Sequence, residues 1–274
     1  MTENKIESDY LLSRINEMFK IVDISNKIVS AKNEERAKQI HEIKDFDRVP
    51  IEDKDGNIKE YYDSNEDKIV QITPADLVSE STGILETLSS LYPNKFYFVL
   101  TGNRITHIVH YSDLNNPIVL PGIYTLIAYC EIEIRKYARE KNTYGKTDSD
   151  IEKLLTDINT RNPSFTIKIT RAKKQLKKKI DNKIETNLLD ELYLDDELIM
   201  FRELISMLND ERSNEFKKCV DLSDTTITSY NKLRNDIMHS NYQMIERQSH
   251  DVEELGVFIK ACQRIISYIE DISN

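Results

Sequence analysis

The feature that most constrains the fold is an internal repeat in the first half of the chain. Residues 28–62 and 77–111 have the same order of predicted elements, at an offset of roughly 47 to 50 residues. Each copy predicts a short apolar strand, an amphipathic helix and a hairpin around a glycine-containing turn. Because such a unit cannot bury its apolar face alone, we expect the two copies to pack as one domain.

The two copies can be assigned element by element. The first predicts a strand, a helix and the two strands of a hairpin, at Ile28–Ser30, Asn33–Ile43, Arg48–Glu52 and Ile58–Tyr62. The second predicts the same elements at Leu77–Ser79, Thr82–Leu91, Phe96–Leu100 and Ile105–Tyr111. An apolar helical stripe also predicts a helix at Ile6–Val22, before the first copy.

The chain changes character after the second copy. The segments Asn115-Asn116-Pro117 and Leu120-Pro121-Gly122 combine turn-forming residues with prolines, a combination typical of a linker that leads into a helix. We therefore predict a domain boundary here. The N-terminal domain is expected to span residues 1–116, and the C-terminal domain residues 117–274.

Helical periodicity dominates the second domain. Apolar residues recur every three to four positions and predict helices over residues 123–141, 150–160, 164–187, 188–208 and 250–272. The segment Tyr230–Tyr242 predicts another helix, the penultimate one. The predicted fold class is α+β, with the two-repeat domain followed by an all-α bundle.

Composition and cysteine usage narrow the functional classes. No apolar run approaches the length of a membrane span and the N-terminus lacks an export signal, so we expect a cytoplasmic protein without a membrane partner. The cysteines Cys130, Cys219 and Cys262 lie far apart, a spacing that predicts buried thiols and neither a zinc site nor a disulfide framework. The formal net charge of −10 implies that any RNA site must be a local basic patch.

The segment Tyr230–Tyr242 places a cation, an amide and an imidazole within two helical turns. Its polar side carries Arg234, Asn235 and His239, and its buried stripe is predicted to contain Leu233, Ile237 and Met238. A guanidinium fits a phosphate, and an imidazole both accepts and donates protons near neutrality. The pair therefore has the chemistry to cut a phosphodiester without a metal. The alternative is a chance pairing, because an arginine five places before a histidine is a weak pattern on its own.

In this context the segment resembles the Arg-x4-6-His motif of HEPN domains, which are helical modules of four to five helices. Arg234, Asn235 and His239 match that motif residue by residue. The resemblance implies a metal-independent endoribonuclease in which these three residues are catalytic. It also implies a homodimer with C2 symmetry, because HEPN nucleases commonly join two such helices across a dimer axis. Phage defence, toxin-like growth arrest and RNA processing all remain open as its biological role.

The repeated N-terminal unit resembles a tandem pair of CBS (cystathionine beta-synthase) domains over about Ile21–Asn116. That resemblance implies an adenine nucleotide as a regulatory ligand in the cleft between the repeats. Asp113 matches the acid that holds the ribose, whereas His110 stands where the family has threonine. In the first copy, Asp63 and Glu66 occupy the two corresponding places. The alternative is a degenerate pair that serves only packing and dimerisation.

A basic stretch provides the second sign of RNA binding. Nine lysines and arginines stand between Arg161 and Lys183 against a single acid, Asp181. Arg171, Lys174 and Lys178 fall at helical spacing, so one helix would present a continuous cationic strip to a phosphate backbone. The alternative is a solvated face that pairs with acidic neighbours, namely Asp190, Glu191, Asp195 and Asp196.

Together these observations predict a CBS-like regulatory domain fused to a HEPN-like ribonuclease that needs no cofactor for catalysis. The competing hypothesis is a noncatalytic nucleotide sensor or dimeric adaptor, in which the helical part only dimerises or holds a partner protein.

Overall fold

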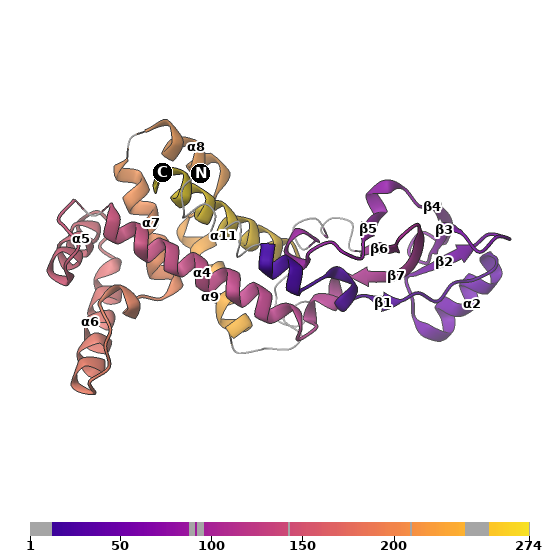
Figure 1. Cartoon of the computed structure of the whole chain (residues 1–274), viewed down its shortest axis with the longest axis horizontal. Helices are drawn as coiled ribbons and strands as arrows, with labels where there is room; N and C mark the ends of the chain where they lie inside the picture. Colours follow the sequence, from indigo (N-terminus) through magenta and orange to yellow (C-terminus); the bar gives the residue numbers. More distant parts are fainter. Residues whose placement is uncertain are drawn as a thin grey trace. The chain divides into compact units, whose positions relative to one another are not determined.

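The computed structural model describes residues 13–87, 91, 96–141, 143–208, 210–238 and 252–273. These residues form a mixed α and β fold with an N-terminal sheet region and C-terminal helices (Figure 1). They divide into two compact units. We call residues 13–122 with 252–256 the sheet unit, and the described residues of 123–238 and 257–273 the helical unit. Among the described helices, none combines the length and apolar content that a membrane span requires.

The sheet unit contains two sheets. The first has the strand order β2–β3–β4, and the second has the order β1–β7–β6–β5. Their bounds are β1 Asn26–Lys27, β2 Arg48–Glu52, β3 Ile58–Asp63, β4 Lys68–Gln71, β5 Leu77–Ser79, β6 Phe96–Thr101 and β7 Arg104–His110. Short 3-10 helices lie at Ile21–Asp23 (η1), Pro74–Asp76 (η2) and Tyr111–Asn115 (η3).

The strand pairing confirms the predicted hairpin in both copies and the predicted first strand of the second copy. The strand predicted at Ile28–Ser30 was wrong, because residues 28–30 form no strand and a single bridge at Ala31 takes its place. In the first copy, Ala31 forms a parallel bridge with Ile51, and β2 then pairs antiparallel with β3. In the second, β5 pairs in parallel with β6, with Val78 opposite Val99, and β6 pairs antiparallel with β7. The equivalent residues of these parallel pairs lie 47 (78 − 31) and 48 (99 − 51) positions apart.

Local chemistry explains why the predicted helix and hairpin of the first copy form. Helix α2, Glu34–Lys44, begins where the Asn33 side chain accepts a hydrogen bond from the Arg36 backbone N–H at 2.9 Å. It ends at Asp45, which has a left-handed backbone with φ of 56°. The hairpin turns at Gly56, whose φ of 78° favours glycine, and Gly102 has the corresponding role in the second copy with φ of 59°.

Two features of the sheet unit were not predicted. Strand β4 extends the first hairpin, and β1 pairs with β7, so the segment before the first copy joins the sheet of the second. The predicted helix at Thr82–Leu91 is described in part and is helical over residues 84–87 and at Leu91. The helix predicted at Ile6–Val22 is described from Ser13 and is helical over residues 13–18.

Each sheet has its own apolar core. The first core gathers side chains from α2, β2 and β3, namely Ala31, Ala37, Ile40, Val49, Ile51 and Tyr62. The second is an aromatic cluster in which Tyr61, Phe96 and Phe98 lie with ring centroids 5.3–5.6 Å apart. Neighbouring Tyr61 and Tyr62 thus serve different cores, because successive side chains of a strand point to opposite faces.

The helical unit follows the predicted pattern with several differences. Its elements are α4 Val119–Glu140, α5 Asp148–Arg161, α6 Phe165–Asp181, η4 Leu189–Glu191, α7 Leu194–Met207, α8 Glu211–Cys219, α9 Asp224–Met238 and α11 Val252–Ser273. The helix predicted over residues 188–208 is divided into η4 and α7, and α8 was not predicted. Helix α4 begins before Pro121, since a proline is tolerated in the first helical turn.

Helix α6 ends six residues before the predicted end at Asn187. The backbone of Lys183 is left-handed with φ of 59°, and the Ile184 N–H returns to the Lys179 carbonyl at 3.0 Å. This six-to-one hydrogen bond is the helix-ending arrangement that usually carries glycine. Here a lysine adopts it, so composition alone did not reveal the end of the helix.

Aromatic side chains fill the centre of the helical unit. The ring of Phe201 lies 5.4 Å from Tyr137 and 6.1 Å from Tyr268, and Tyr230 stacks on Phe258 at 4.7 Å. Two sequence-based expectations about burial were wrong. Met238 is 36% exposed because it ends α9, and Cys219 is exposed at the end of α8, whereas Cys130 and Cys262 are buried.

Candidate functional site

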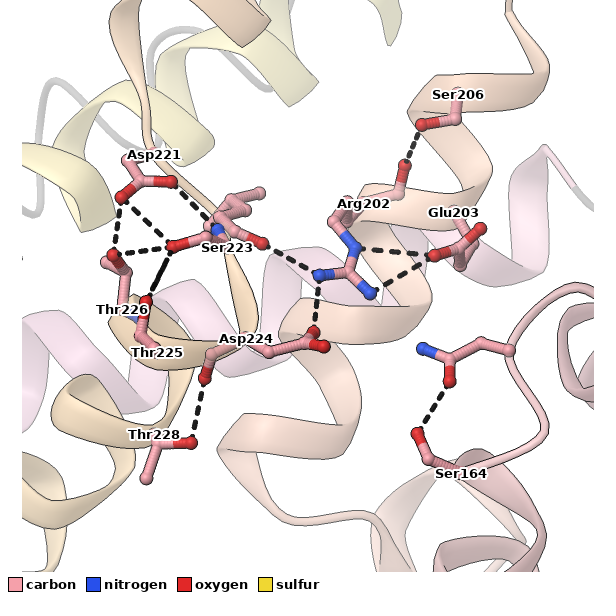
Figure 2. Close-up of polar contacts among 12 residues, drawn as sticks. Ser164, Arg202, Glu203, Ser206, Asp221, Ser223, Asp224, Thr225, Thr226 and Thr228 are labelled. Carbon is pink, nitrogen blue, oxygen red and sulfur yellow. Dashed lines mark hydrogen bonds and ion pairs between the residues drawn. The ribbon is translucent and has the colours of Figure 1, made fainter.

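The start of α9 is fixed to α7 by a polar network (Figure 2). The Arg202 guanidinium donates through Nη1 to the Leu222 carbonyl at 3.0 Å and to the Asp224 carboxylate at 2.7 Å. Just before the helix, Asp221 accepts hydrogen bonds from the Ser223 N–H at 2.8 Å and from the Thr226 hydroxyl at 2.5 Å. These contacts satisfy groups at the helix N-terminus and fix where α9 begins.

Packing then fixes the rotation of α9 about its axis. Tyr230, Leu233 and Ile237 are buried, at spacings of three and four residues. Arg234 follows Leu233 and therefore lies at the edge of this buried stripe, with 25% of its side chain exposed. Asn235, one position further, is exposed. The third motif residue, His239, lies outside the described residues.

The Arg234 side chain takes part in a chain of alternating charges across α9, α4 and α7. Its Nε donates to Glu131 Oε1 at 3.1 Å, and its Nη1 donates to Asn235 Oδ1 at 3.3 Å. The other oxygen of Glu131 accepts from Arg135 Nη2 at 3.4 Å. Arg135 Nε donates in turn to Glu197 Oε1 at 2.5 Å. We call these residues, Arg234, Glu131, Arg135 and Glu197, the charge chain.

The two carboxylates of the charge chain are more buried than its two arginines, and burial is greatest at Glu197. The side chains of Arg234 and Arg135 are about a quarter exposed, that of Glu131 is 11% exposed, and that of Glu197 is fully buried. Burial raises the pKa of Glu197 to about 8, although the Arg135 guanidinium opposes that shift. Its second oxygen, Oε2, has no hydrogen-bond partner among the described residues. The inner end of the chain is therefore a carboxyl group that favours its neutral form.

The geometry leaves one edge of Arg234 available. Nε is used by Glu131, whereas Nη2 makes no hydrogen bond with the residues that the structure describes. A guanidinium held through Nε presents its outer N–H groups in a fixed direction, and a phosphate or carboxylate accepts such a fork in two hydrogen bonds. This arrangement can orient an anion beside α9.

Sequence reasoning missed the other three residues of the charge chain, Glu131, Arg135 and Glu197. Glu131 and Arg135 stand four residues apart within the apolar stripe of α4, and Glu197 interrupts the apolar stripe of α7. Charged residues at core positions are rare unless they are paired. That signal could have indicated a buried ion-pair cluster, although it could not have indicated which residues pair.

The basic stretch separates into two faces on α6. Arg171 forms an ion pair with Asp196, and its guanidinium lies 3.6 Å from the centre of the Tyr193 ring. Lys174 and Lys178 are exposed, and neither forms an ion pair with a residue that the structure describes. Of the three predicted RNA contacts, the structure therefore places Arg171 in the packing against α7 and the other two at the surface.

The predicted nucleotide residues lie in two places in the sheet unit. Asp113 and His110 line a cleft of about 540 Å³ between the two repeats, together with Asn26, Lys27, Ile28, Val29, Asp45, Phe46, Asp47, Arg48, Pro50, Ile108 and Ser112. Asp63 is buried at the end of β3 and lies 3.6 Å from Arg48 Nε. Glu66 stands in the exposed turn before β4, paired with Lys68.

Both oxygens of Asp113 are engaged. Oδ1 accepts from the Asn26 amide at 2.9 Å, and Oδ2 accepts from the His110 backbone N–H at 2.7 Å, which caps η3. Burial raises the pKa of Asp113, and these two hydrogen bonds oppose the shift. Each oxygen has a second lone pair, so a ribose hydroxyl could still donate to the carboxylate.

Among the described residues, no group of three or more His, Cys, Asp and Glu side chains comes together in a way that could hold a metal ion. No protein family model, curated protein or solved structure matches the chain.

Proposed function

We propose that the chain is a metal-independent endoribonuclease of the HEPN type, with Arg234, Asn235 and His239 as its catalytic residues. The observation that supports this function best is the Arg234 side chain, which Glu131 holds through Nε while the outer edge of the guanidinium stays accessible. An arginine in this state is suited to orient a phosphodiester, because little reorganisation is needed when the anion arrives.

The proposed reaction breaks one P–O bond and forms another. The ribose 2′-oxygen attacks the adjacent phosphorus while His239 accepts the 2′-hydroxyl proton or donates a proton to the leaving 5′-oxygen. Arg234 offsets the negative charge that builds on the non-bridging oxygens, and Asn235 orients the guanidinium. The products are a 2′,3′-cyclic phosphate and a 5′-hydroxyl. DNA lacks the attacking group and is expected to resist cleavage.

We propose that the active form is a homodimer with C2 symmetry. Two copies of the Arg-x4-His motif would then supply two arginines and two histidines to one cleft, which gives one histidine for each proton transfer. The Arg234 side chain is 25% exposed, and this exposure is compatible with a site completed by a second chain.

The sheet unit supports a regulatory role. Its cleft of about 540 Å³ lies between the repeats, has the size typical of small-molecule sites and is lined by Asp113 and His110. Arg48 and Lys27 in the same lining supply positive charge for a phosphate. We propose an adenine-containing nucleotide as its ligand, which would change RNA cleavage by roughly 5- to 150-fold through differential binding to two states.

One observation favours a noncatalytic alternative, in which the chain is a nucleotide sensor or dimeric adaptor. Arg234 belongs to the charge chain, and a buried ion-pair cluster can serve packing alone. In that case the loss of Arg234 or His239 would change dimerisation or partner binding and would leave RNA intact.

Incubation of the purified protein with mixed RNA in EDTA tests the proposal. The wild type is expected to cleave RNA, and His239→Ala is expected to lose that activity. His107→Ala is a matched control in the sheet unit, where His107 contacts Thr106 and lies outside the cleft lining. If no cleavage occurs with or without adenine nucleotides, the nuclease proposal is rejected in favour of the adaptor. Calorimetry of wild type and Asp113→Ala with linear and cyclic adenine nucleotides tests the ligand separately.

A further inference from the structure

Helix α6 carries seven lysines and arginines, and the structure divides them between two faces. One face meets acids from neighbouring elements. Lys168 lies 2.8 Å from Asp196, which also pairs with Arg171, and Lys179 lies 2.8 Å from Glu191. Asp196 and Glu191 are buried, so these cations compensate charges inside the helical unit and are not available to a ligand.

The lysines on the other face of α6 are not neutralised by acids of the described residues. Lys174, Lys177 and Lys178 are exposed and form no ion pair with any residue that the structure describes. At 100° per residue the three fall within an arc of about 100°, and they span about 6 Å along the axis. Lys173, at the margin of this face, lies 3.3 Å from Glu152. We call Lys174, Lys177 and Lys178 the lysine strip.

The surroundings of the lysine strip indicate its partner. The chain has 48 acids and 38 lysines and arginines, so a stretch that keeps uncompensated cations contrasts with the rest of the molecule. Within the helical unit, the C-terminal part of α6 extends beyond the helices that it packs against (Figure 1). An anionic strand can therefore approach these exposed lysines from solvent.

The residues beside the strip narrow the class of partner further. The only large apolar side chain on the same face of α6 is Ile167, which is 78% exposed. A helix that lies on a membrane needs a continuous apolar face, and this face has none. It also carries no aromatic ring on which a base could stack, since the single aromatic residue of α6, Phe165, is buried. What it offers is positive charge at helical spacing, which suits phosphates.

We propose that the lysine strip binds the phosphate backbone of a single nucleic acid strand without reading its bases. This inference deepens the proposed function and rests on it, because a ribonuclease needs a surface that holds its substrate. The strip contacts about two or three phosphates. Binding is therefore independent of base sequence, and it does not distinguish ribose from deoxyribose.

The test uses a 5′-fluorescein-labelled 20-nucleotide DNA strand and the RNA of the same sequence, with fluorescence anisotropy from 50 to 200 mM salt. The DNA lacks the 2′-hydroxyl and stays intact even if the protein is a ribonuclease. The variant is Lys174→Gln with Lys177→Gln and Lys178→Gln. Glutamine keeps helix propensity while it removes charge, and circular dichroism checks that α6 is retained.

A second triple variant controls for net charge. Lys146→Gln, Lys217→Gln and Lys218→Gln remove three exposed lysines from other elements of the same unit. The strip variant is expected to bind both strands roughly 10- to 100-fold more weakly at the lowest salt. The slope of log affinity against log salt should fall by about 2. The control variant should change affinity less than about twofold, as rim charges away from a site do.

Equal losses of affinity in the two triple variants, or unchanged affinity in the strip variant, would overturn the proposal that the lysine strip binds nucleic acid. Strip-dependent binding to vesicles of phosphatidylserine and phosphatidylcholine, without binding to either strand, would overturn it in favour of a membrane. The nuclease is judged by cleavage in the same RNA samples. If the strip variant loses binding and the wild type does not cleave RNA, the lysine strip is supported and the nuclease proposal is rejected. If the wild type and the strip variant bind and cleave RNA equally well, only the lysine strip proposal is rejected.

Discussion

Helices α9 and α6 both present cations from the helical unit, but they hold them in opposite ways. On α9 a single arginine, Arg234, is held by Glu131, which is itself held by Arg135. On α6 the lysine strip extends into solvent without an ion-pair partner among the described residues. A cation that is held has a defined direction and suits the stabilisation of a transition state. Cations that are not held supply a field, which raises affinity and association rate.

If the chain is the proposed nuclease, this difference separates catalysis from binding. Changes on α9 are expected to lower kcat at nearly constant RNA affinity, and changes on α6 are expected to weaken RNA binding at nearly constant kcat.

Arg234→Ala should have the largest effect. Loss of a group that stabilises developing charge lowers kcat by roughly 100- to 1,000-fold. Arg234→Lys should fail nearly as badly, since an ammonium cannot donate to Glu131 and also present a planar fork. Single-turnover cleavage and RNA anisotropy measure the two quantities. If Arg234→Ala weakened RNA binding by the same factor as it lowered cleavage, the two helices would not differ in role.

Glu197 should make stability depend on pH. Its pKa is raised from 4.5 in a free side chain to about 8 by burial. The folded state therefore binds more protons than the unfolded state between about pH 4.5 and about 8, and stability is lost as pH rises through this window. The slope attributable to this group is at most about 1.4 kcal/mol per pH unit.

Urea unfolding of wild type and Glu197→Gln between pH 5 and 8 measures that contribution. The glutamine variant should lose less stability over this range than the wild type, because its side chain does not titrate. A parallel pH dependence in the two proteins would mean that Glu197 is ionised in the folded state.

Glu131→Gln should lower kcat by roughly tenfold and leave RNA affinity unchanged. The amide oxygen can still accept from Arg234 Nε, but the amide N–H₂ then faces Arg135, so the hold on Arg234 loosens. Glu133→Gln is the matched control, because Glu133 is a buried acid on the same helix that pairs with Lys136 at 2.6 Å. Equal kcat losses in the two variants would indicate general damage to α4.

Arg171→Gln should have the smallest effect on RNA, a change in affinity of less than about twofold. The Arg171 guanidinium forms an ion pair with Asp196 and lies over the Tyr193 ring. The loss of Arg171 should therefore lower the melting temperature of the protein. Thermal unfolding and anisotropy distinguish these outcomes. A loss of RNA affinity as large as that of the lysine strip variant would mean that the RNA-binding surface of α6 includes Arg171.

The separation of α6 into two faces also marks how far sequence reasoning reaches. Periodicity predicted the hairpins, helix α2 and the long helices, because those patterns depend on local spacing. It did not predict that β1 joins β7, that β4 extends the first hairpin or that Lys183 ends α6. These outcomes depend on tertiary pairing or on one unusual backbone conformation.

The candidate site shows the same limit. Arg234 and Asn235 were identified from their motif, whereas the partner of Arg234 stands 103 residues away in the chain. Lys174 and Arg171 have the same charge and lie one turn apart, yet only Arg171 meets a buried acid. Which carboxylate reaches which cation is decided by how helices pack against one another, and a single sequence does not contain that information in a local pattern.

If Arg234 and His239 cut RNA through the ribose 2′-hydroxyl, the chemistry of the product ends will show it. A synthetic RNA oligonucleotide is incubated with wild-type protein in EDTA, and the fragments are weighed by mass spectrometry. A second substrate carries a single deoxyribose 5′ to the cleaved bond. We expect fragments with a 2′,3′-cyclic phosphate and a 5′-hydroxyl, and no cleavage beside the deoxyribose. Fragments with a 5′-phosphate, or cleavage that requires magnesium, would contradict this mechanism.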